Sequence, residues 1–164
     1  MTIQKVLVIG AGQMGSGIAQ VCAQAGFDVK LNDMKEEYFQ RGLANITKNL
    51  SRNVEKGRMT EEEKSQVLSR ITKSLDLNDA SDVDLVIEAA VENMEIKQKI
   101  FKQLDEITPK HAILASNTSS LPITEIAAAT NRPAQVIGMH FMNPVPVMKL
   151  VEIIRGLATT DDVY

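Results

Sequence analysis

Four polar side chains in the last third of the chain could carry out proton chemistry: Ser119, His140, Asn143 and Glu152. The pKa of a free histidine is about 6.5, so His140 could take up and release a proton near neutral pH. A carboxylate such as Glu152 could fix the imidazole tautomer, and Ser119 and Asn143 could hydrogen-bond a carbonyl or hydroxyl group. A hydride-transfer dehydrogenase needs a base of this kind, because a proton must leave the alcohol oxygen as the hydride leaves the carbon.

The residue types alone leave two plainer interpretations open. A histidine at the end of a strand is often simply hydrogen-bonded, and Glu152 could be a surface residue of a strand. The other histidine, His111, follows Lys110 in an expected turn and has no predicted role.

A second functional pattern lies near the start of the chain, in residues 5–33. The apolar run 6–9 is typical of a buried parallel strand; it ends in a G-x-G-x-x-G motif, and a helical pattern follows at once. Gly26 ends that helix, and a second strand leads to Asp33. This order of elements predicts a dinucleotide-binding site. Asp33 could accept both ribose hydroxyls and would repel a 2′-phosphate, which predicts NAD rather than NADP.

Each part of the glycine motif has a physical role. Gly10 allows the tight turn, Gly12 lets the backbone approach a pyrophosphate, and Gly15 lets the helix pack closely on the strand. The start of the helix, at Gln13 and Met14, offers unpaired N–H groups to phosphate. A glycine turn in an ordinary α/β protein is the alternative interpretation.

The elements that must position these residues follow an alternating order. Short apolar runs alternate with amphipathic helical patterns, which predicts an α/β fold with a Rossmann-type, doubly wound, mostly parallel sheet. Strands are expected at residues 6–9, 29–33, 84–89, 112–115, 136–139 and 149–154, with a further short strand or edge at 71–75. Helices are expected between Gly15 and Gly26 and at about residues 34–56, 60–69, 94–106 and 123–129.

Two helices, in place of one, separate the second strand from the next, so a helical hairpin is inserted there. Thr60 and Glu63 have the spacing of a capping box, which predicts the start of its second helix. Its first helix carries Lys48, Arg52 and Lys56 at four-residue steps, a basic stripe on one face. On pattern alone, a solvated helix face is the favoured interpretation of this stripe.

The helix expected at residues 94–106 follows the strand 84–89 and its polar turn. Glu92 and Lys97 therefore either lie near the cofactor or begin this helix. Its buried face is expected to hold Ile96, Ile100, Phe101 and Leu104.

The overall composition limits the class of protein. The chain has 164 residues, the length of one domain, with 44% hydrophobic and 24% charged residues, as in globular proteins. A net charge of −3 argues against a general nucleic-acid binder, and no apolar run is long enough to span a membrane. There is no recognisable signal peptide and no Cys/His cluster typical of a metal site. The single cysteine, Cys22, is expected to be buried and reduced, which suits the cytoplasm.

Four stretches resemble the NAD-binding half of the 3-hydroxyacyl-CoA dehydrogenase family, especially its short-chain 3-hydroxybutyryl-CoA members from bacteria. They are VLVIGAGQMGSGIAQ, DLVIEAAVENMEIKQKIF, ILASNTSSLPITEIA and VIGMHFMNPVPVMKLVEIIRG. They span nearly the whole chain, and the last two are not general features of dinucleotide-binding domains. The resemblance implies an NAD-dependent oxidoreductase that reversibly interconverts 3-hydroxybutyryl-CoA and acetoacetyl-CoA.

The resemblance also implies roles for the four polar side chains. His140 would be the catalytic base in oxidation and the acid in reduction, with Glu152 as its partner. Ser119 would bind the substrate oxygen beside the nicotinamide, and Asn143 would help to hold the reacting groups.

The resemblance implies contacts with the cofactor and the CoA moiety as well. Cofactor contacts are expected at Gly10, Gly12, Gln13, Met14, Gly15, Asp33, Glu92, Lys97, Ser119 and Asn143. Arg52 and Lys56 match positions at which relatives hold the CoA nucleotide with lysines, which reverses the preference for a solvated face. Because position 52 is an arginine here, the geometry of that contact stays open.

Relatives in this family continue for a comparable length into a helical second domain, whereas this chain ends at Tyr164. The resemblance therefore implies that residues 1–164 are the NAD-binding domain alone, without the domain that closes the cleft and makes a homodimer. Thr160–Asp162 are expected to cap a further helix. Two alternatives remain: a non-catalytic NAD-binding module, against which the four polar side chains argue, and a dehydrogenase of another hydroxy acid, against which the basic stripe argues.

Overall fold

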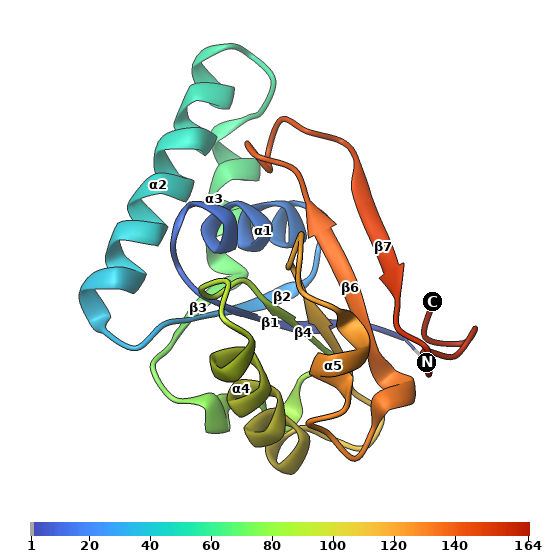
Figure 1. The fold of residues 1–164 in the computed structure, drawn as a ribbon. Coiled ribbons are helices and arrows are strands. Elements are labelled where there is room, and N and C mark those ends of the chain that lie inside the picture. Colours follow the sequence, from blue (N-terminus) through green and yellow to red (C-terminus); the bar gives the residue numbers. More distant parts are fainter. Residues whose placement is uncertain (1) are drawn as a thin grey trace.

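A seven-stranded sheet forms the centre of the computed structural model, which describes residues 2–164 (Figure 1). The strands are β1 (Lys5–Ile9), β2 (Asp28–Asn32), β3 (Ile71–Ser74), β4 (Leu85–Glu88), β5 (Ile113–Ser116), β6 (Val136–Phe141) and β7 (Val151–Arg155). They lie in the order β3-β2-β1-β4-β5-β6-β7, and every neighbouring pair is parallel except β6 with β7. The predicted doubly wound, mostly parallel sheet is confirmed. The strand order reverses between β1 and β4, and ligands bind at the carboxyl ends of strands at such a point.

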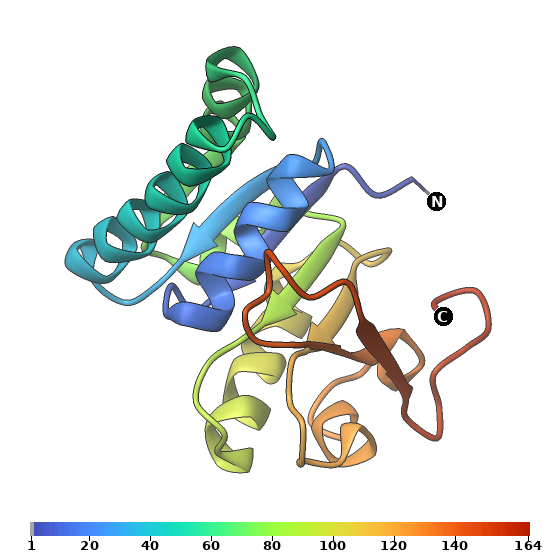
Figure 2. The ribbon, with the colours of Figure 1, turned by 90° about the horizontal axis from the view of Figure 1, so that it is seen from above.

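The described residues form five α-helices, which lie on the two faces of this sheet and, for one pair, beside it (Figure 2). They are α1 (Gln13–Gln24), α2 (Glu36–Glu55), α3 (Glu61–Ser69), α4 (Met94–Ile107) and α5 (Ile123–Ala127). Because side chains alternate along a strand, Val6 and Val8 of β1 pack with α1, α2 and α3, whereas Leu7 and Ile9 pack with α4 and α5. Burial on both faces explains why these strands are continuous apolar runs in the sequence.

Helices α2 and α3 form the predicted insertion, a hairpin that stands beside the sheet (Figure 1). The apolar face of α2 buries Phe39, Ile46 and Leu50. The predicted capping box at the start of α3 is confirmed: the Glu63 backbone N–H donates to the Thr60 hydroxyl at 3.1 Å, and the Thr60 N–H donates to the Glu63 carboxylate at 3.2 Å. These two bonds satisfy N–H groups that have no partner inside the helix.

Helix α4 differs from its prediction at one residue. Phe101 and Leu104 are fully buried and Ile100 is partly buried, but Ile96 is 42% exposed. Ile96 lies in the first turn of α4 and lines a cleft together with Asp33. The prediction that Ile96 is buried was wrong, because helical spacing does not show how far a helix extends past the sheet that it covers.

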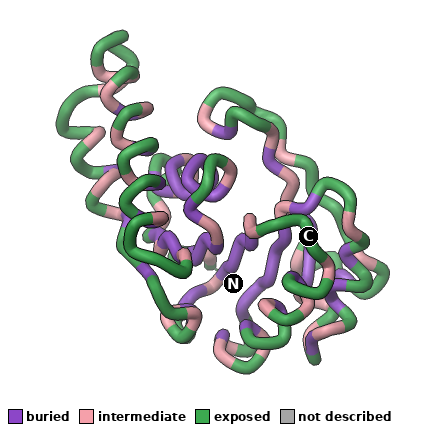
Figure 3. The backbone as a smooth tube through the Cα atoms, turned by 60° about the vertical axis from the view of Figure 1, so that its left-hand side comes forward, coloured by how far each residue is buried: buried purple, intermediate pink, exposed green. Residues whose placement is uncertain are grey.

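The last two strands also differ from the expected bounds. β6 continues to Phe141, two residues beyond its expected end, so His140 lies within the strand. β7 runs antiparallel along the edge of the sheet and is mostly exposed (Figure 3). After it, the Tyr164 N–H donates to the Thr160 carbonyl oxygen at 3.1 Å, which closes a single turn where a helix cap was predicted.

The described residues contain no helix that is long and apolar enough to cross a membrane. Within residues 2–164 there is also no group of three or more His, Cys, Asp or Glu side chains that could hold a metal ion. Cys22, in α1, is partly buried and packs against the core. Burial raises the pKa of its thiol to about 11.

Candidate active site

The loop between β1 and α1 is shaped by its three glycines. Gly10 has a φ of +101°, a left-handed conformation that glycine adopts readily. A Cβ atom on Gly15 would lie 1.6 Å from the Gly10 carbonyl oxygen, so α1 can pack against this loop only with glycine there. A Cβ atom on Gly12 would meet nothing within 4 Å, so the backbone there faces open space. The loop therefore leaves room for a ligand at Gly12 and is tightly packed at the other two positions.

The start of α1 is suited to an anion. It has no side-chain cap and no acidic residue in its first turn, whereas α2 and α3 both have acidic residues in theirs. The first N–H groups of a helix lack partners inside it and carry the positive end of its dipole. Without a carboxylate or a hydroxyl to satisfy them, these groups are available to a phosphate.

A cleft of about 570 Å³, here called the glycine-loop cleft, opens between this loop and α4. Its lining includes Gly12, Gln13, Met14 and Asp33. The Asp33 carboxylate is fixed at the end of β2, because it accepts the Ala11 N–H at 2.8 Å and the Met34 N–H at 2.6 Å. It stands where the predicted fingerprint requires an acidic side chain for the ribose.

A second cleft, of about 310 Å³, adjoins the first and is here called the His140 cleft. Met14, Ala89 and Ala90 line both clefts, so they are neighbours along the carboxyl edge of the sheet. Ser119, His140 and Asn143 line the His140 cleft, each from the end of a strand or the loop after it. Three of the four side chains expected to act together therefore lie around one cavity.

The fourth of these side chains, Glu152, lies beside His140 on β7. The antiparallel register places Glu152 directly opposite His140, and the His140 Nδ1 lies 3.0 Å from the Glu152 Oε1. When the imidazole is neutral, Nδ1 carries the proton and donates to this carboxylate, and Nε2 is left able to accept a proton. The pair can thus act as a general base with a fixed tautomer.

Two amides fix the loops on either side of the His140 cleft. The Gln13 Nε2 donates to the Asn143 Oδ1 at 3.2 Å, which links the glycine loop to the loop after β6. The Asn117 Oδ1 accepts the Phe141 N–H at 2.8 Å, and so ties the end of β5 to the residue after His140. Sequence reasoning missed Asn117; its position in the polar loop directly after a predicted strand was the only available signal.

Comparison with known proteins shows to which family this chain belongs. The family profile described as "3-hydroxyacyl-CoA dehydrogenase, NAD binding domain" matches residues 5–164. This chain belongs to the 3-hydroxyacyl-CoA dehydrogenase family. A probable 3-hydroxybutyryl-CoA dehydrogenase of Bacillus subtilis is 60% identical over 162 residues, which are 99% of this chain and 56% of that protein. A 3-hydroxybutyryl-CoA dehydrogenase of Bradyrhizobium diazoefficiens is 56% identical over 162 residues, which are 99% of this chain and 55% of that protein.

Solved structures agree with the sequence comparison. FadB2 of Mycobacterium tuberculosis superposes with a TM-score of 0.96 at 49% identity, covering 99% of this chain and 57% of that one. The (S)-3-hydroxybutyryl-CoA dehydrogenase of Ralstonia eutropha gives a TM-score of 0.96 at 48% identity with the same coverage. The predicted family and fold are confirmed, and the chain spans about half the length of the relatives it matches.

Glu92 and Lys97, which the family resemblance assigns to the cofactor, lie differently in the structure. Glu92 lines the His140 cleft and its side chain is 44% exposed. Lys97 is fully buried, and its Nζ lies 2.7 and 2.9 Å from the two carboxylate oxygens of Glu88 and 3.4 Å from Glu92. Although partial burial raises the pKa of Glu92, hydrogen bonds from Thr118 and Ser120 and the charge of Lys97 hold it below its usual value. Lys97 therefore meets these carboxylates and has no surface facing either cleft.

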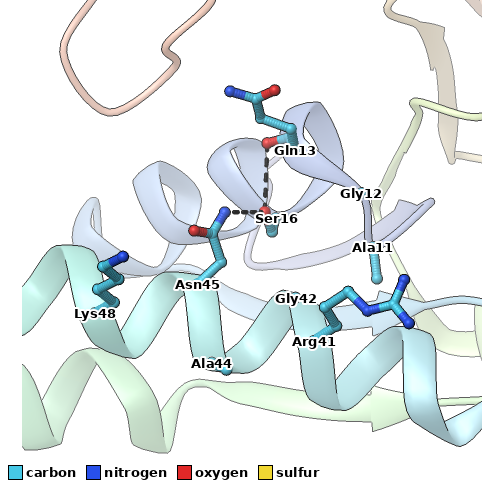
Figure 4. Close-up of a pocket in the computed structure, with 9 residues that line it drawn as sticks. All are labelled: Ala11, Gly12, Gln13, Ser16, Arg41, Gly42, Ala44, Asn45 and Lys48. Carbon is cyan, nitrogen blue, oxygen red and sulfur yellow. Dashed lines mark hydrogen bonds between the residues drawn. The ribbon is translucent and has the colours of Figure 1, made fainter.

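The basic stripe predicted from the sequence is divided between two cavities. Arg52 and Lys56, together with Arg58, line a cleft of about 400 Å³, here called the basic cleft, between α1, α2 and the loop 144–147. Lys48 instead lines a pocket of about 470 Å³ beside the glycine loop, with Arg41 and Asn45 (Figure 4). In that pocket the Ser16 hydroxyl donates to the Gln13 carbonyl oxygen at 3.3 Å, and the Asn45 amide donates to Ser16 at 3.4 Å. The two residues predicted to hold CoA thus share one cleft, and Lys48 stands apart from them.

Proposed function

We propose that this chain is the NAD-binding domain of an enzyme that interconverts 3-hydroxybutyryl-CoA and acetoacetyl-CoA with NAD(H). The observation that carries the proposal is the His140–Glu152 pair, which shares its cleft with Ser119 and Asn143 and adjoins the glycine-loop cleft. The names of the relatives that are 56% and 60% identical support the same reaction.

The residues of the glycine-loop cleft fit NAD(H). The open space at Gly12 and the uncapped start of α1 suit its pyrophosphate, and the fixed carboxylate of Asp33 suits an unmodified ribose. Asp33 would repel a 2′-phosphate, so NAD(H) is preferred over NADP(H). When bound, this cofactor supplies the hydride acceptor for oxidation and the hydride donor for reduction.

The residues of the His140 cleft handle the proton and the substrate oxygen. During oxidation, His140 Nε2 takes the proton of the 3-hydroxyl group as C3 loses a hydride, and during reduction it returns that proton to the oxygen. Glu152 stabilises the imidazolium that forms, since its carboxylate meets Nδ1. Ser119 and Asn143 hydrogen-bond the reacting oxygen and hold it beside the imidazole.

The basic cleft would hold the CoA moiety. Arg52 lies in the last turn of α2 and Lys56 directly follows the helix, so both can meet phosphates of one nucleotide. Asn143 lines the His140 cleft and Pro144, the next residue, lines the basic cleft, so one loop contributes to both. We expect the acyl end of the substrate to lie in the first cleft and its nucleotide end in the second. A homodimer formed through the second domain of relatives stays a prediction of the resemblance, and a cytoplasmic location stays a prediction from the single cysteine, Cys22.

Two binding measurements and one assay test the proposal on this chain. Calorimetry should detect NADH binding and, in the presence of NADH, binding of acetoacetyl-CoA. Oxidation of NADH should depend on acetoacetyl-CoA. Free acetoacetate should be a far poorer substrate, because it cannot occupy the basic cleft. NADH binding with neither binding nor reduction of acetoacetyl-CoA would instead identify a non-catalytic NAD-binding module.

A further inference from the structure

The loop that carries Ser119 is held from both sides by a single carboxylate. The Thr118 hydroxyl donates to the Glu92 Oε2 at 2.7 Å, and the Ser120 hydroxyl donates to the same oxygen at 3.1 Å. Ser119, between them, is exposed to the His140 cleft. The direction in which Ser119 presents its hydroxyl therefore depends on where the Glu92 carboxylate stands.

The Glu92 carboxylate is fixed in turn by a charge inside the protein. The Lys97 Nζ lies 3.4 Å from the Glu92 Oε1, and the Lys97 side chain is only 1% exposed. A buried ammonium cannot be left without partners at low cost, so it holds the carboxylates that neutralise it. Glu92, though half open to water, is thus anchored at one oxygen by Lys97 and uses its other oxygen for the loop.

The same lysine links this contact to the bases of two loops. Its second partner, Glu88, is fully buried and accepts the Ser116 hydroxyl at 2.7 Å and the Ala90 N–H at 2.7 Å. Ser116 is the last residue of β5, and Ala90 lies in the loop that lines both clefts. Two carboxylates that share one ammonium therefore hold the Ser119 loop at its start and at its centre.

We propose that Glu92 is a positioning residue for Ser119, and that the buried Lys97–Glu88 pair keeps it in place. This inference rests on the proposed function only in taking Ser119 as the residue that binds the reacting oxygen. It assigns Glu92 a task that differs from cofactor contact: the carboxylate orients Ser119 through Thr118 and Ser120. Lys97 acts at a further step, through Glu92.

A double-mutant cycle on acetoacetyl-CoA reduction by this chain separates the two tasks of Glu92. Glu92→Gln keeps an acceptor for the two hydroxyls but loses the attraction to Lys97, and should lower turnover about tenfold, because small misplacements of reacting groups can cost up to ~10²-fold. In a Ser119→Ala background the same change should cost less than about twofold, since residues that act through one another are not additive. NADH affinity should stay within about twofold.

The matched control is Glu95→Gln, which removes the same charge from an exposed position three residues away in the first turn of α4. It should leave turnover in both backgrounds unchanged. Equal losses from Glu92→Gln with and without Ser119, or a tenfold loss of NADH affinity, would overturn the proposal and return Glu92 to the role of a cofactor contact.

A second readout does not depend on activity. Amide hydrogen exchange of residues 118–121, followed by NMR in the chain without ligands, should become at least tenfold faster in Glu92→Gln and in Ser120→Ala, with exchange in β1 unchanged. Unaltered exchange in both variants would refute the role of Glu92 in holding this loop. If the unmodified chain binds NADH but does not reduce acetoacetyl-CoA, the proposed function fails, while this measurement still decides whether Glu92 holds the loop.

Discussion

His140 and Glu152 stand directly opposite each other on the antiparallel strands β6 and β7, and the imidazole Nδ1 lies 3.0 Å from the carboxylate oxygen. β7 is the one strand of the described sheet that runs against its neighbour. A parallel strand would need a long crossover, whereas this return brings a residue twelve positions away beside the histidine. The antiparallel edge strand thus supplies the carboxylate that meets the His140 imidazole.

The first prediction concerns this pair. His140→Gln removes the proton carrier and should lower turnover of acetoacetyl-CoA by at least ~10²-fold, the usual effect of losing a general acid–base group. Glu152→Gln keeps the shape but not the charge that stabilises the imidazolium, so it should also lower turnover. NADH affinity, measured by fluorescence titration, should change little in either variant. Near-normal turnover in His140→Gln would mean that another group carries the proton.

The second prediction concerns the choice of cofactor. NADH should bind this chain more tightly than NADPH, because the fixed Asp33 carboxylate would lie beside the 2′-phosphate. Asp33→Ala should narrow the difference in affinity between NADH and NADPH, because it weakens NADH binding and removes the repulsion of the 2′-phosphate. Fluorescence titration with both reduced cofactors measures each affinity. Equal affinities in the unmodified chain would contradict the role of Asp33.

The third prediction concerns the basic cleft. Replacing Arg52 and Lys56 together by alanine should raise the Michaelis constant for acetoacetyl-CoA, and more so at low salt, where exposed charges are least screened. The Michaelis constant for acetoacetyl-pantetheine, which lacks the nucleotide, should stay the same. Lys48→Ala is the matched control, because Lys48 lies on the same helix but lines a different pocket. An equal rise in the Michaelis constants of both substrates would mean that Arg52 and Lys56 have a structural role.

Sequence reasoning succeeded where the relevant signal is local. The glycine motif, the capping box of Thr60 and Glu63, and the alternation of strands and helices each depend on residues a few positions apart.

Sequence reasoning failed where the outcome depends on what a residue contacts after folding. Ile96 fits the apolar face of a helix, yet that part of α4 overhangs a cleft. Asn117 is one polar loop residue among several until β6 places the Phe141 N–H beside it.

Lys97 shows the same limit for a charged residue. A lysine near the start of a helix is normally solvated, and nothing in its neighbours along the chain indicates full burial. Its burial requires Glu88 on β4 and Glu92 in the next turn to converge on it, a tertiary arrangement. The strand pattern of β4 did predict that Glu88 lies in the sheet, but not that its charge is neutralised from α4.

The fourth prediction concerns Cys22. Burial raises the pKa of its thiol to about 11, so little thiolate is present near pH 8, and the thiolate is the reactive form. Alkylation by iodoacetamide at that pH should be at least ~10²-fold slower in the folded chain than in urea. Mass spectrometry of quenched samples gives both rates. Similar rates in the two states would show that the helix α1 opens readily.

The last prediction concerns acid stability. The Asp84 carboxylate accepts the N–H groups of Gln4 and Lys5 at 2.9 and 3.0 Å, and its other oxygen lies 2.8 Å from the His111 Nε2. The hydrogen bond from His111, followed by those from the two backbone N–H groups, lowers the pKa of Asp84 from 3.8 to about 2. A lowered pKa in the folded state means that the ionised carboxylate stabilises the fold above pH 3.8, and that this contribution is lost as the pH falls toward 2.

Asp84→Asn should therefore lower the free energy of unfolding at pH 7, by about 1 kcal/mol, since the site is partly open to water and solvent screens such contacts. The difference in the free energy of unfolding between variant and parent should shrink steadily below about pH 4, because the parent also loses its carboxylate charge there. Urea unfolding at several pH values measures this free energy. Asp28→Asn, an exposed position at the start of β2, is the control and should change stability by less than about 0.5 kcal/mol throughout. A difference that is independent of pH would mean that the shape of the Asp84 side chain, and not its charge, ties the start of β1 to β4.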